Sequence, residues 1–265
     1  MRQDILCVGL IGYGAIGQEV NRLLTQRNKD DITIVGALIH HPTLPRPHNS
    51  PNIVTTLSDL LAAQPQVIVE VAGHGGLREH GPAILRAGID LLFVSVGALA
   101  EPGVLQVLFD EAQKSGAKAK VVSGAIGALD ALASASIGEL STVIHTMRRF
   151  PETLLPPEEA ARLTTAREVF RGNARQAAQK FPEFLNIAAA VALAGIGFDR
   201  TEVRVVADPI VKHSVHEVYA EGTFGIFRFG IENVPMDLPT PRGAKLVAMS
   251  IVRSLLLRDA SLVVG

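Results

Sequence analysis

The chain has 265 residues, of which 48% are hydrophobic and 19% are charged, a composition typical of a folded globular protein. Its 25 basic and 26 acidic residues leave a net charge of −1 at pH 7, so no basic excess is present to neutralise nucleic-acid phosphates. Cys7 is the single cysteine, which excludes an intrachain disulfide framework and a thiolate zinc cluster.

The apolar runs indicate neither a membrane span nor a secretion signal. The longest smooth run, Ile187 to Phe198, is too short to cross a bilayer. The apolar stretch near the N-terminus leads directly into glycines and lacks the length and cleavage site of a signal peptide. We therefore expect a cytoplasmic protein that binds neither membrane nor nucleic acid.

Short apolar runs alternate with helical patterns through the first part of the chain. Buried strands are predicted at Ile5–Ile11, Ile32–Ile39, Val67–Val71, Leu91–Val96 and Lys120–Val122. Helices are predicted at Ile16–Gln26, Leu77–Ala87 and Pro102–Ser115. Alternation of this kind predicts an α/β fold, a doubly wound parallel Rossmann sheet with right-handed crossovers, over residues 1–128.

A different pattern follows over residues 129–240. Strands are predicted at Ser141–Arg149, Thr201–Ala207, Val215–Tyr219 and Gly225–Glu232, and helices at Asn173–Lys180 and Asn186–Gly195. Several of these strands alternate apolar and polar residues, as half-buried antiparallel strands do, which predicts a second, α+β domain. The last segment, residues 241–265, contains a helix with a broad apolar face, Ala244–Leu257, which we expect to return to the first domain.

The strongest local motif is a glycine-rich turn, Gly12-Tyr-Gly14-Ala15-Ile16-Gly17, between the first strand and the first helix. Gly12 permits the tight turn, Gly14 lets a pyrophosphate approach the backbone, and Gly17 lets helix and strand pack closely. The free N–H groups at the helix start, including those of Ala15 and Ile16, favour an anion there. This context predicts dinucleotide binding.

The end of the second strand bears on the choice of cofactor. NAD-binding folds usually place a carboxylate there to hold the ribose 2′-hydroxyl. Here the strand ends in His40 and His41, with Arg46 nearby and no carboxylate in that window. NADP is therefore favoured, with the histidines as donors to the 2′-phosphate. The alternative is NAD bound without the acidic contact.

Three further turns follow predicted strands of the same sheet. Ligands in open α/β sheets lie outside the carboxyl ends of the strands, so we expect these turns to line the cofactor and substrate sites. The residues concerned are Ala72, Gly73, His74, Ser95 and Val96 for the cofactor, and Ser123 and Gly124 for the substrate.

Several stretches of the chain resemble the L-aspartate dehydrogenases. The matching segments are Leu85–Leu92, Ser95–Leu99, Val121–Asp130, Asn186–Gly195, Ala207–Pro209 and Val215–Val218. The resemblance covers nearly the whole chain and implies an N-terminal Rossmann domain, a C-terminal domain of mixed sheet and a homodimer. It also implies oxidation of L-aspartate to iminoaspartate with NAD or NADP, an imine that in some organisms feeds NAD biosynthesis.

The resemblance also assigns roles to individual residues. His216 matches the active-site histidine of the family, and Ala125 and Asn186 match residues that bind the cofactor near its nicotinamide. A histidine with an ordinary pKa of about 6.5 can take a proton from the amine and later activate water near neutral pH. Glu217 would point away from His216 in an extended strand, so we expect Asp208 to support it.

Two segments depart from the family pattern. An Asn-Pro-Lys-Thr-Ser-like segment is replaced by Thr240–Ala244, and an Arg-Lys-Pro-Pro-like segment by Met147–Pro151. The substrate carboxylates need cationic or N–H partners. Residues expected to bind the substrate are Ser123, Gly124, Asp208, Arg242 and Lys245, with Arg148 and Arg149 as alternative cations.

No spacing of His, Asp or Glu is typical of a metal site, so we expect no metal. The sequence thus predicts an NAD(P)-dependent L-aspartate dehydrogenase acting on a small molecule. One alternative is a dehydrogenase of the same fold that uses NADP and another small dicarboxylate or amino acid. A second alternative is a non-catalytic NADP-binding sensor.

Overall fold

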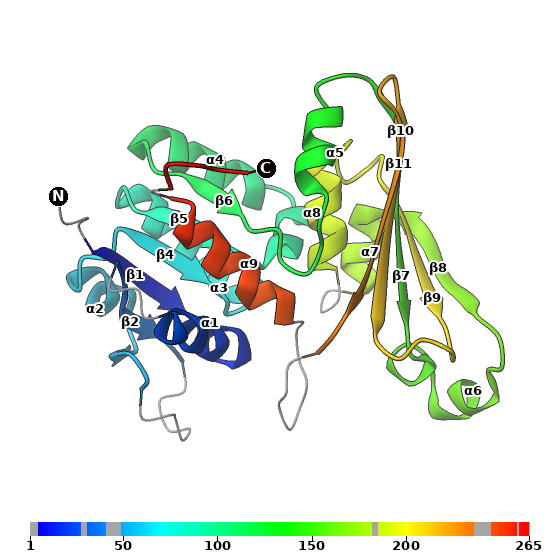
Figure 1. Ribbon diagram of the computed structural model, residues 1–265, viewed down its shortest axis with the longest axis horizontal. Coiled ribbons are helices and arrows are strands. Elements are labelled where there is room, and N and C mark those ends of the chain that lie inside the picture. Colours follow the sequence, from blue (N-terminus) through cyan, green and yellow to red (C-terminus); the bar gives the residue numbers. More distant parts are fainter. Residues whose placement is uncertain are drawn as a thin grey trace. The chain divides into compact units, whose positions relative to one another are not determined.

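A computed structural model describes residues 5–27, 31–40, 49–181, 185–235, 245–258 and 260–264. The chain divides into two compact units (Figure 1). The first contains the described residues up to Gly124 together with Val247–Val264, and the second contains those from Ala125 to residue 235 together with 245–246. Within the described ranges, no helix is long and apolar enough to cross a membrane.

The first unit is built on a six-stranded parallel sheet with the order β3-β2-β1-β4-β5-β6. Its strands are β1 (Leu6–Ile11), β2 (Ile32–Leu38), β3 (Ile53–Val54), β4 (Val67–Glu70), β5 (Asp90–Phe93) and β6 (Ala119–Val121). Its helices are α1 (Ala15–Gln26), α2 (Leu57–Ala62), α3 (His74–Arg86), the 3-10 helix η1 (Val96–Ala100), α4 (Val104–Ser115) and α9 (Lys245–Leu256), which begins in the second unit.

The order of these strands reverses between β1 and β4. Successive right-handed crossovers run outward from β1 in one direction and from β4 in the other, which places their helices on opposite faces of the sheet. Every residue of β4 is buried, as expected for a central strand covered on both faces. The predicted doubly wound Rossmann sheet is therefore confirmed.

The C-terminal helix packs on this first unit from Val247 onward. Its apolar stripe, which includes Val247, Ile251 and Leu255, is buried. Beyond the helix, Arg258 donates to the carboxylate of Asp90 in β5 at 2.7 Å. Both observations agree with the predicted return of the last segment to the Rossmann sheet.

The second unit contains a five-stranded mixed sheet with the order β11-β10-β7-β9-β8. Its strands are β7 (Leu140–Arg149), β8 (Arg167–Asn173), β9 (Glu202–Ala207), β10 (Ser214–Gly222) and β11 (Gly225–Asn233). Its helices are α5 (Leu129–Ala135), the 3-10 helix η2 (Pro151–Thr153), α6 (Pro157–Arg162), α7 (Ala174–Lys180) and α8 (Asn186–Ala194).

Two details of this sheet differ from the expected antiparallel arrangement. β7 and β9 are parallel, whereas the other neighbours are antiparallel. The edge strand β8 was not predicted, because its charged and polar residues carry no clear hydrophobic alternation. The prediction of a second α+β domain holds, with a mixed sheet.

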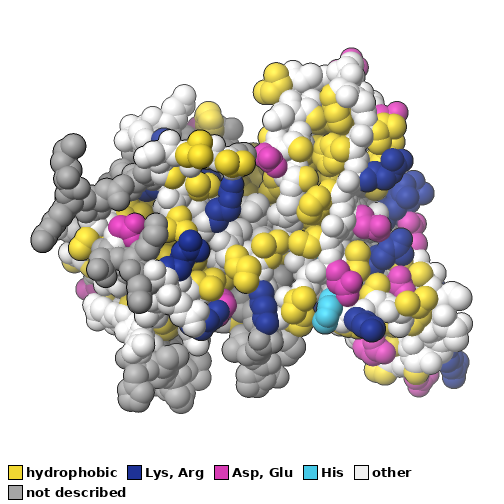
Figure 2. Space-filling model, in the orientation of Figure 1, with side chains coloured by type: hydrophobic (Ala, Val, Ile, Leu, Met, Phe, Trp, Pro, Cys, Tyr) yellow, Lys and Arg dark blue, Asp and Glu magenta, His cyan; other side chains and the backbone are white. Residues whose placement is uncertain are grey.

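One face of the second sheet is covered by helices and the other carries charged side chains. α8 contacts β7, and α7 contacts β9. Val143, His145 and Met147 of β7 are fully buried, whereas the residues between them are only half-buried. Figure 2 shows Lys/Arg and Asp/Glu side chains intermixed on the right-hand part of the second unit.

Candidate active site

The glycine-rich turn after β1 leaves open space where a pyrophosphate would lie. Gly12 has a φ of +92°, and a Cβ added to it would lie 2.9 Å from the carbonyl oxygen of Val71. A Cβ on Gly17 would lie 2.7 Å from the oxygen of Gly12. No described atom comes within 4 Å of a Cβ on Gly14, so the protein itself leaves room for a side chain there. A steric need for glycine at this position would come from a bound group that approaches the backbone.

The helix that follows is available to an anion. α1 begins at Ala15, and no side chain of the described residues caps its first turn. The N–H groups there and the positive end of the helix dipole favour phosphate. The turn and the helix start therefore fit the pyrophosphate of a dinucleotide.

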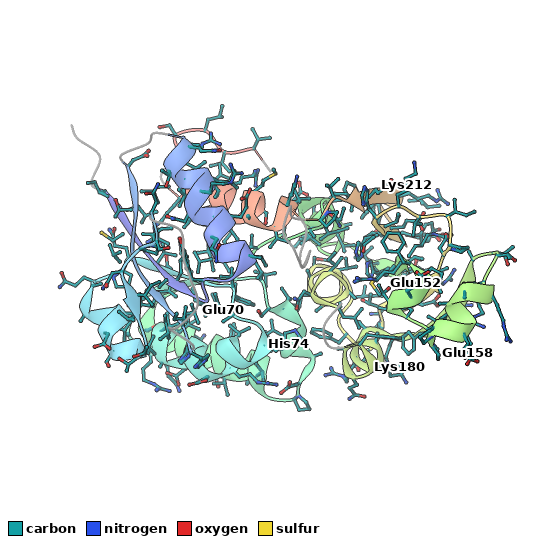
Figure 3. The ribbon with its side chains drawn as sticks, turned by 90° about the horizontal axis from the view of Figure 1, so that it is seen from below. Glu70, His74, Glu152, Glu158, Lys180 and Lys212 are labelled. Atoms are coloured by element: carbon teal, nitrogen blue, oxygen red, sulfur yellow. The ribbon has the colours of Figure 1, made fainter. Side chains whose placement is uncertain are left out.

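A buried carboxylate that we did not predict organises the next two turns. Glu70, the last residue of β4, is 0% exposed. Its Oε1 accepts hydrogen bonds from the N–H groups of Ala72 at 2.7 Å and Gly73 at 2.9 Å, and from the hydroxyl of Ser95 at 2.8 Å. Its Oε2 accepts from the N–H of Ser95 at 3.3 Å. Glu70 thus connects the turns after β4 and β5, and His74 begins α3 beside it (Figure 3).

Burial raises the pKa of Glu70, and its four hydrogen bonds act in the opposite direction. Each of these bonds uses the carboxylate as an acceptor and so offsets part of the effect of burial, which leaves the pKa of Glu70 above its usual value. Ala72 and Gly73 are exposed beside this carboxylate, whereas Ser95 and Val96 are buried. The structure therefore brings Ala72, Gly73 and Ser95 together around Glu70, a residue that the sequence analysis did not single out.

The carboxylate of Glu79, from α3, lies near His40, just beyond the end of β2. Ligand atoms of His40, Glu79 and His80 lie within 4.8 Å of one another, and the rings of His40 and His80 stack at 6.0 Å. Glu79 and His80 come from α3, so the spacing along the sequence gave no sign of this group. His40 and Glu79 are exposed, whereas His80 is buried, and burial lowers its pKa. His40 therefore lies beside a carboxylate, although none is present at the end of β2 itself.

The second unit places His216 next to another histidine. His216 of β10 and His145 of β7 are 5% and 0% exposed. Nδ1 of His216 lies 3.1 Å from Nε2 of His145. We expected Asp208 to support His216, and this expectation is wrong, because His145 is the hydrogen-bond partner. Sequence reasoning missed His145 because the pairing of β7 with β10 brings the two residues together.

The pKa of His216 is not ordinary. Burial is the largest cause and the nearby Arg149 guanidinium the second, and together they lower the pKa of His216 to about 4. The pKa of His145 is lowered well below its usual value by burial and by His216. Both rings are therefore neutral at pH 7, so the ordinary value of about 6.5 expected for His216 does not apply.

Arginines on opposite faces of β7 have different surroundings. Arg149 lies two residues from Met147, the cross-strand partner of His216, so it shares the face of His216. Burial lowers the pKa of the half-buried Arg149. Arg148 lies on the other face, where it donates to Glu217 at 3.0 Å and to Asp208 at 3.5 Å. Asp208 is thus paired with Arg148, away from His216.

The two residues expected near the nicotinamide lie in a turn and in a helix of the second unit. The carbonyl oxygen of Ala125, which is buried, accepts a hydrogen bond from Nδ2 of Asn233 at 2.9 Å. Asn186 is the first residue of α8, and Leu185 occupies the cap position before it. Asn186 therefore does not cap α8, the alternative role that such a residue often has.

The other predicted residues are dispersed. Ser123 is exposed and Gly124 has a φ of +64°, and both lie within three residues of the end of β6. Lys245 begins α9, and its N–H donates to the oxygen of Val234. His41 and Arg242 lie outside the described residues, as does the segment Thr240–Ala244.

Comparisons with known proteins show which families and structures this chain resembles. Residues 130–258 match the family described as aspartate dehydrogenase, C-terminal, and residues 12–121 match homoserine dehydrogenase, NAD binding domain. An L-aspartate dehydrogenase of Ralstonia pickettii is 38% identical, covering 95% of this chain and 97% of that protein. One from Pseudomonas aeruginosa is also 38% identical, with the same coverage. The crystal structure of aspartate dehydrogenase from Thermotoga maritima superposes with a TM-score of 0.80 at 25% identity, covering 98% of this chain and 99% of that chain.

Proposed function

Because the chain belongs to the L-aspartate dehydrogenase family, we propose that it oxidises L-aspartate to iminoaspartate, which hydrolyses to oxaloacetate and ammonia. One observation carries the proposal. In the second unit, a buried neutral histidine and a half-buried arginine share one face of the sheet, and these two groups suit a substrate that bears both an amine and carboxylates. The first unit supplies the dinucleotide turn that the reaction requires.

The fold assigns the pyridine nucleotide to the first unit. The turn Gly12–Gly17 would hold its pyrophosphate, and the turns of Ala72–His74 and Ser95, positioned by Glu70, would hold the rest of the molecule. When bound, the nicotinamide accepts a hydride from the substrate. We further infer that Ala125 and Asn186 contact the cofactor, as their positions in the family pattern imply.

NADP is the cofactor that we propose as preferred. β2 itself ends without a carboxylate, and His40, two residues after the end of β2, is a donor for a 2′-phosphate. Glu79 is close enough to His40 to act on the same subsite. A carboxylate there would repel a phosphate and favour a ribose hydroxyl, so the balance of His40 and Glu79 sets the preference.

We propose that His216 contacts the reacting carbon–nitrogen group and that Arg149 binds a substrate carboxylate. The face shared by these two side chains supports this assignment. Charge-assisted hydrogen bonds from a planar guanidinium suit a carboxylate. Arg148 lies on the other face of β7, where it pairs with Asp208 and Glu217, so it does not share the face of His216.

The assembly, location and metabolic role that we propose follow the family. The outer face of β7–β11 is the surface that we assign to a homodimer, and we assign the enzyme to the cytoplasm. The iminoaspartate would be available for NAD biosynthesis. Sedimentation of the purified chain tests the dimer directly.

The test of the activity is the oxidation of NADPH, and separately of NADH, with oxaloacetate and ammonia. His216→Ala should lower the ammonia-dependent rate by about 10²- to 10⁴-fold. His213→Ala, in the loop before β10, is the matched control and should leave the rate near that of wild type. A wild-type protein that binds NADPH but shows no ammonia-dependent oxidation would contradict the proposal.

A further inference from the structure

His145 and His216 form a closed pair of imidazoles within the second unit. Nε2 of His145 and Nδ1 of His216 are 3.1 Å apart. The ring planes differ by 7° and the ring centres are 5.3 Å apart, so the two nitrogens meet end to end. At this separation one nitrogen must carry a proton and donate it to the other.

The other nitrogen of His145 determines the direction of this hydrogen bond. Nδ1 of His145 is fully buried and has no hydrogen-bond partner among the described residues. A proton on Nδ1 would therefore be a buried, unsatisfied N–H group, which proteins avoid more strictly than an unsatisfied acceptor. The neutral ring of His145 must then carry its proton on Nε2 and donate it to His216.

The position of the proton on His216 follows directly. Its Nδ1 accepts the hydrogen bond from His145, so the proton of the neutral His216 ring lies on Nε2. Burial keeps the pKa of His145 well below its usual value and that of His216 at about 4, so neither ring carries a second proton at pH 7. Nε2 of His216 makes no hydrogen bond within the described residues and is not among the fully buried atoms without a partner, so this nitrogen keeps some exposure.

We propose that His145 is a positioning residue that holds His216 as a neutral Nε2–H donor, so that His216 donates a hydrogen bond to the reacting group of the substrate and does not act as a general base. This inference rests on the proposed function. In the direction of amination, the acceptor would be the ketone oxygen of oxaloacetate. A neutral imidazole fixed in advance can polarise a carbonyl in this way without reorganising during the reaction.

A general base would require the opposite arrangement. Nε2 of His216 could accept a proton only if Nδ1 carried the ring's own proton and donated it to His145. His145 would then have to carry its proton on the buried Nδ1, where the described residues offer no acceptor. The structure therefore favours the donor tautomer of His216.

The tautomers can be measured without any turnover. Long-range ¹H–¹⁵N correlation spectra of the full chain with ¹⁵N-labelled histidine distinguish the two neutral tautomers and the charged ring. Signals are assigned by their loss in His145→Gln and His216→Asn. We expect both rings as Nε2–H tautomers at pH 7. An Nδ1–H tautomer at His216, or a charged ring in either residue at pH 7, would overturn the proposal.

Two variants of His145 separate hydrogen bonding from space filling. His145→Gln keeps an amide donor near the place of Nε2, so His216 should keep its tautomer and kcat should stay within about threefold of wild type. His145→Met removes the donor but keeps a side chain of similar length, so His216 should show mixed tautomers. We then expect kcat to fall about tenfold or more, with KM for the cofactor unchanged.

Other outcomes also decide the matter. Equal losses of kcat in both variants, with the tautomer of His216 unchanged, would show that His145 only fills space and would overturn the proposal. If His145→Met does not fold, the wild-type and His145→Gln spectra still give the tautomers. If wild type shows no turnover with aspartate or oxaloacetate, the proposed function fails, whereas the spectra still test the assignment of the proton.

Discussion

Ser95 donates both its backbone N–H and its hydroxyl to the buried carboxylate of Glu70, which also accepts the N–H groups of Ala72 and Gly73. Two turns separated by a helix and a strand are therefore held by one side chain. The carboxylate of Glu70, the last residue of β4, is the acceptor that holds the conformation of both turns. Removal of that acceptor should loosen both turns together.

Glu70→Gln should lower stability and weaken cofactor binding. Glutamine keeps one acceptor oxygen, but its NH₂ group would face a donor that the carboxylate now satisfies. We expect a loss of about 1–3 kcal/mol in the free energy of unfolding and a raised Kd for NADPH. Urea unfolding and fluorescence titration with NADPH measure the two effects. Ser95→Ala removes one donor and should give the same changes at smaller size, whereas an unchanged Kd in both variants would contradict the role of Glu70.

The stability of the protein should fall as the pH drops from about 6.5 towards 4. The pKa of His216 is about 4 in the folded chain, below its ordinary value of 6.5, so the unfolded chain binds more protons between these limits. Stability then rises with pH across this window and is lost on acidification, by at most about 1.4 kcal/mol per pH unit for one group. His145 changes in the same direction, because its pKa is also lowered.

Urea unfolding at several pH values from 4.5 to about 7.5 tests this dependence. His216→Gln removes one of the two buried titrating rings, so its free energy of unfolding should depend less steeply on pH than that of wild type. Carboxylates elsewhere titrate equally in both proteins and cancel in the difference. Parallel curves for wild type and His216→Gln would show that His216 keeps an ordinary pKa.

Much of the first unit could be predicted because its signals are local. The strand that ends at Ile11, the turn Gly12–Gly17 and the helix after it each follow from spacing within a few residues. Glu70 could have drawn attention as the acid that ends a run of buried apolar residues. Its partner Ser95 could not be identified, because the contact depends on how β4 and β5 pair.

The candidate site of the second unit was less predictable, because it too depends on how strands pair. The register that pairs His216 with Met147 brings His145 and Arg149 to its face and sends Arg148 and Asp208 to the other. One residue of slip in register would have reversed this set. The resemblance to the family singled out His216. The pairing of the strands shows which neighbours lower its pKa and which of its ring nitrogens carries the proton.

Arg149→Gln should raise KM for aspartate by about 10- to 100-fold, because the substrate carboxylate would lose a charge-assisted partner. KM for the cofactor should change little. Arg148→Gln is the matched control on the other face of β7, where Asp208 and Glu217 already hold that guanidinium. Steady-state kinetics at saturating NADP measure both constants. A larger rise of KM for aspartate in Arg148→Gln than in Arg149→Gln would show that the assignment of the two arginines is reversed.

His40→Asp should shift the cofactor preference from NADPH towards NADH. A carboxylate at position 40, just beyond the end of β2, can accept a hydrogen bond from the ribose 2′-hydroxyl and repels a 2′-phosphate. The ratio of kcat/KM for NADPH to that for NADH should therefore fall about tenfold or more. Glu79→Gln removes the carboxylate that lies beside His40 and should change the ratio in the opposite direction. Both variants alter exposed side chains, so melting temperatures should stay near that of wild type. An unchanged ratio in both variants would mean that the end of β2 does not read the 2′ position, and the preference for NADP would then need another source.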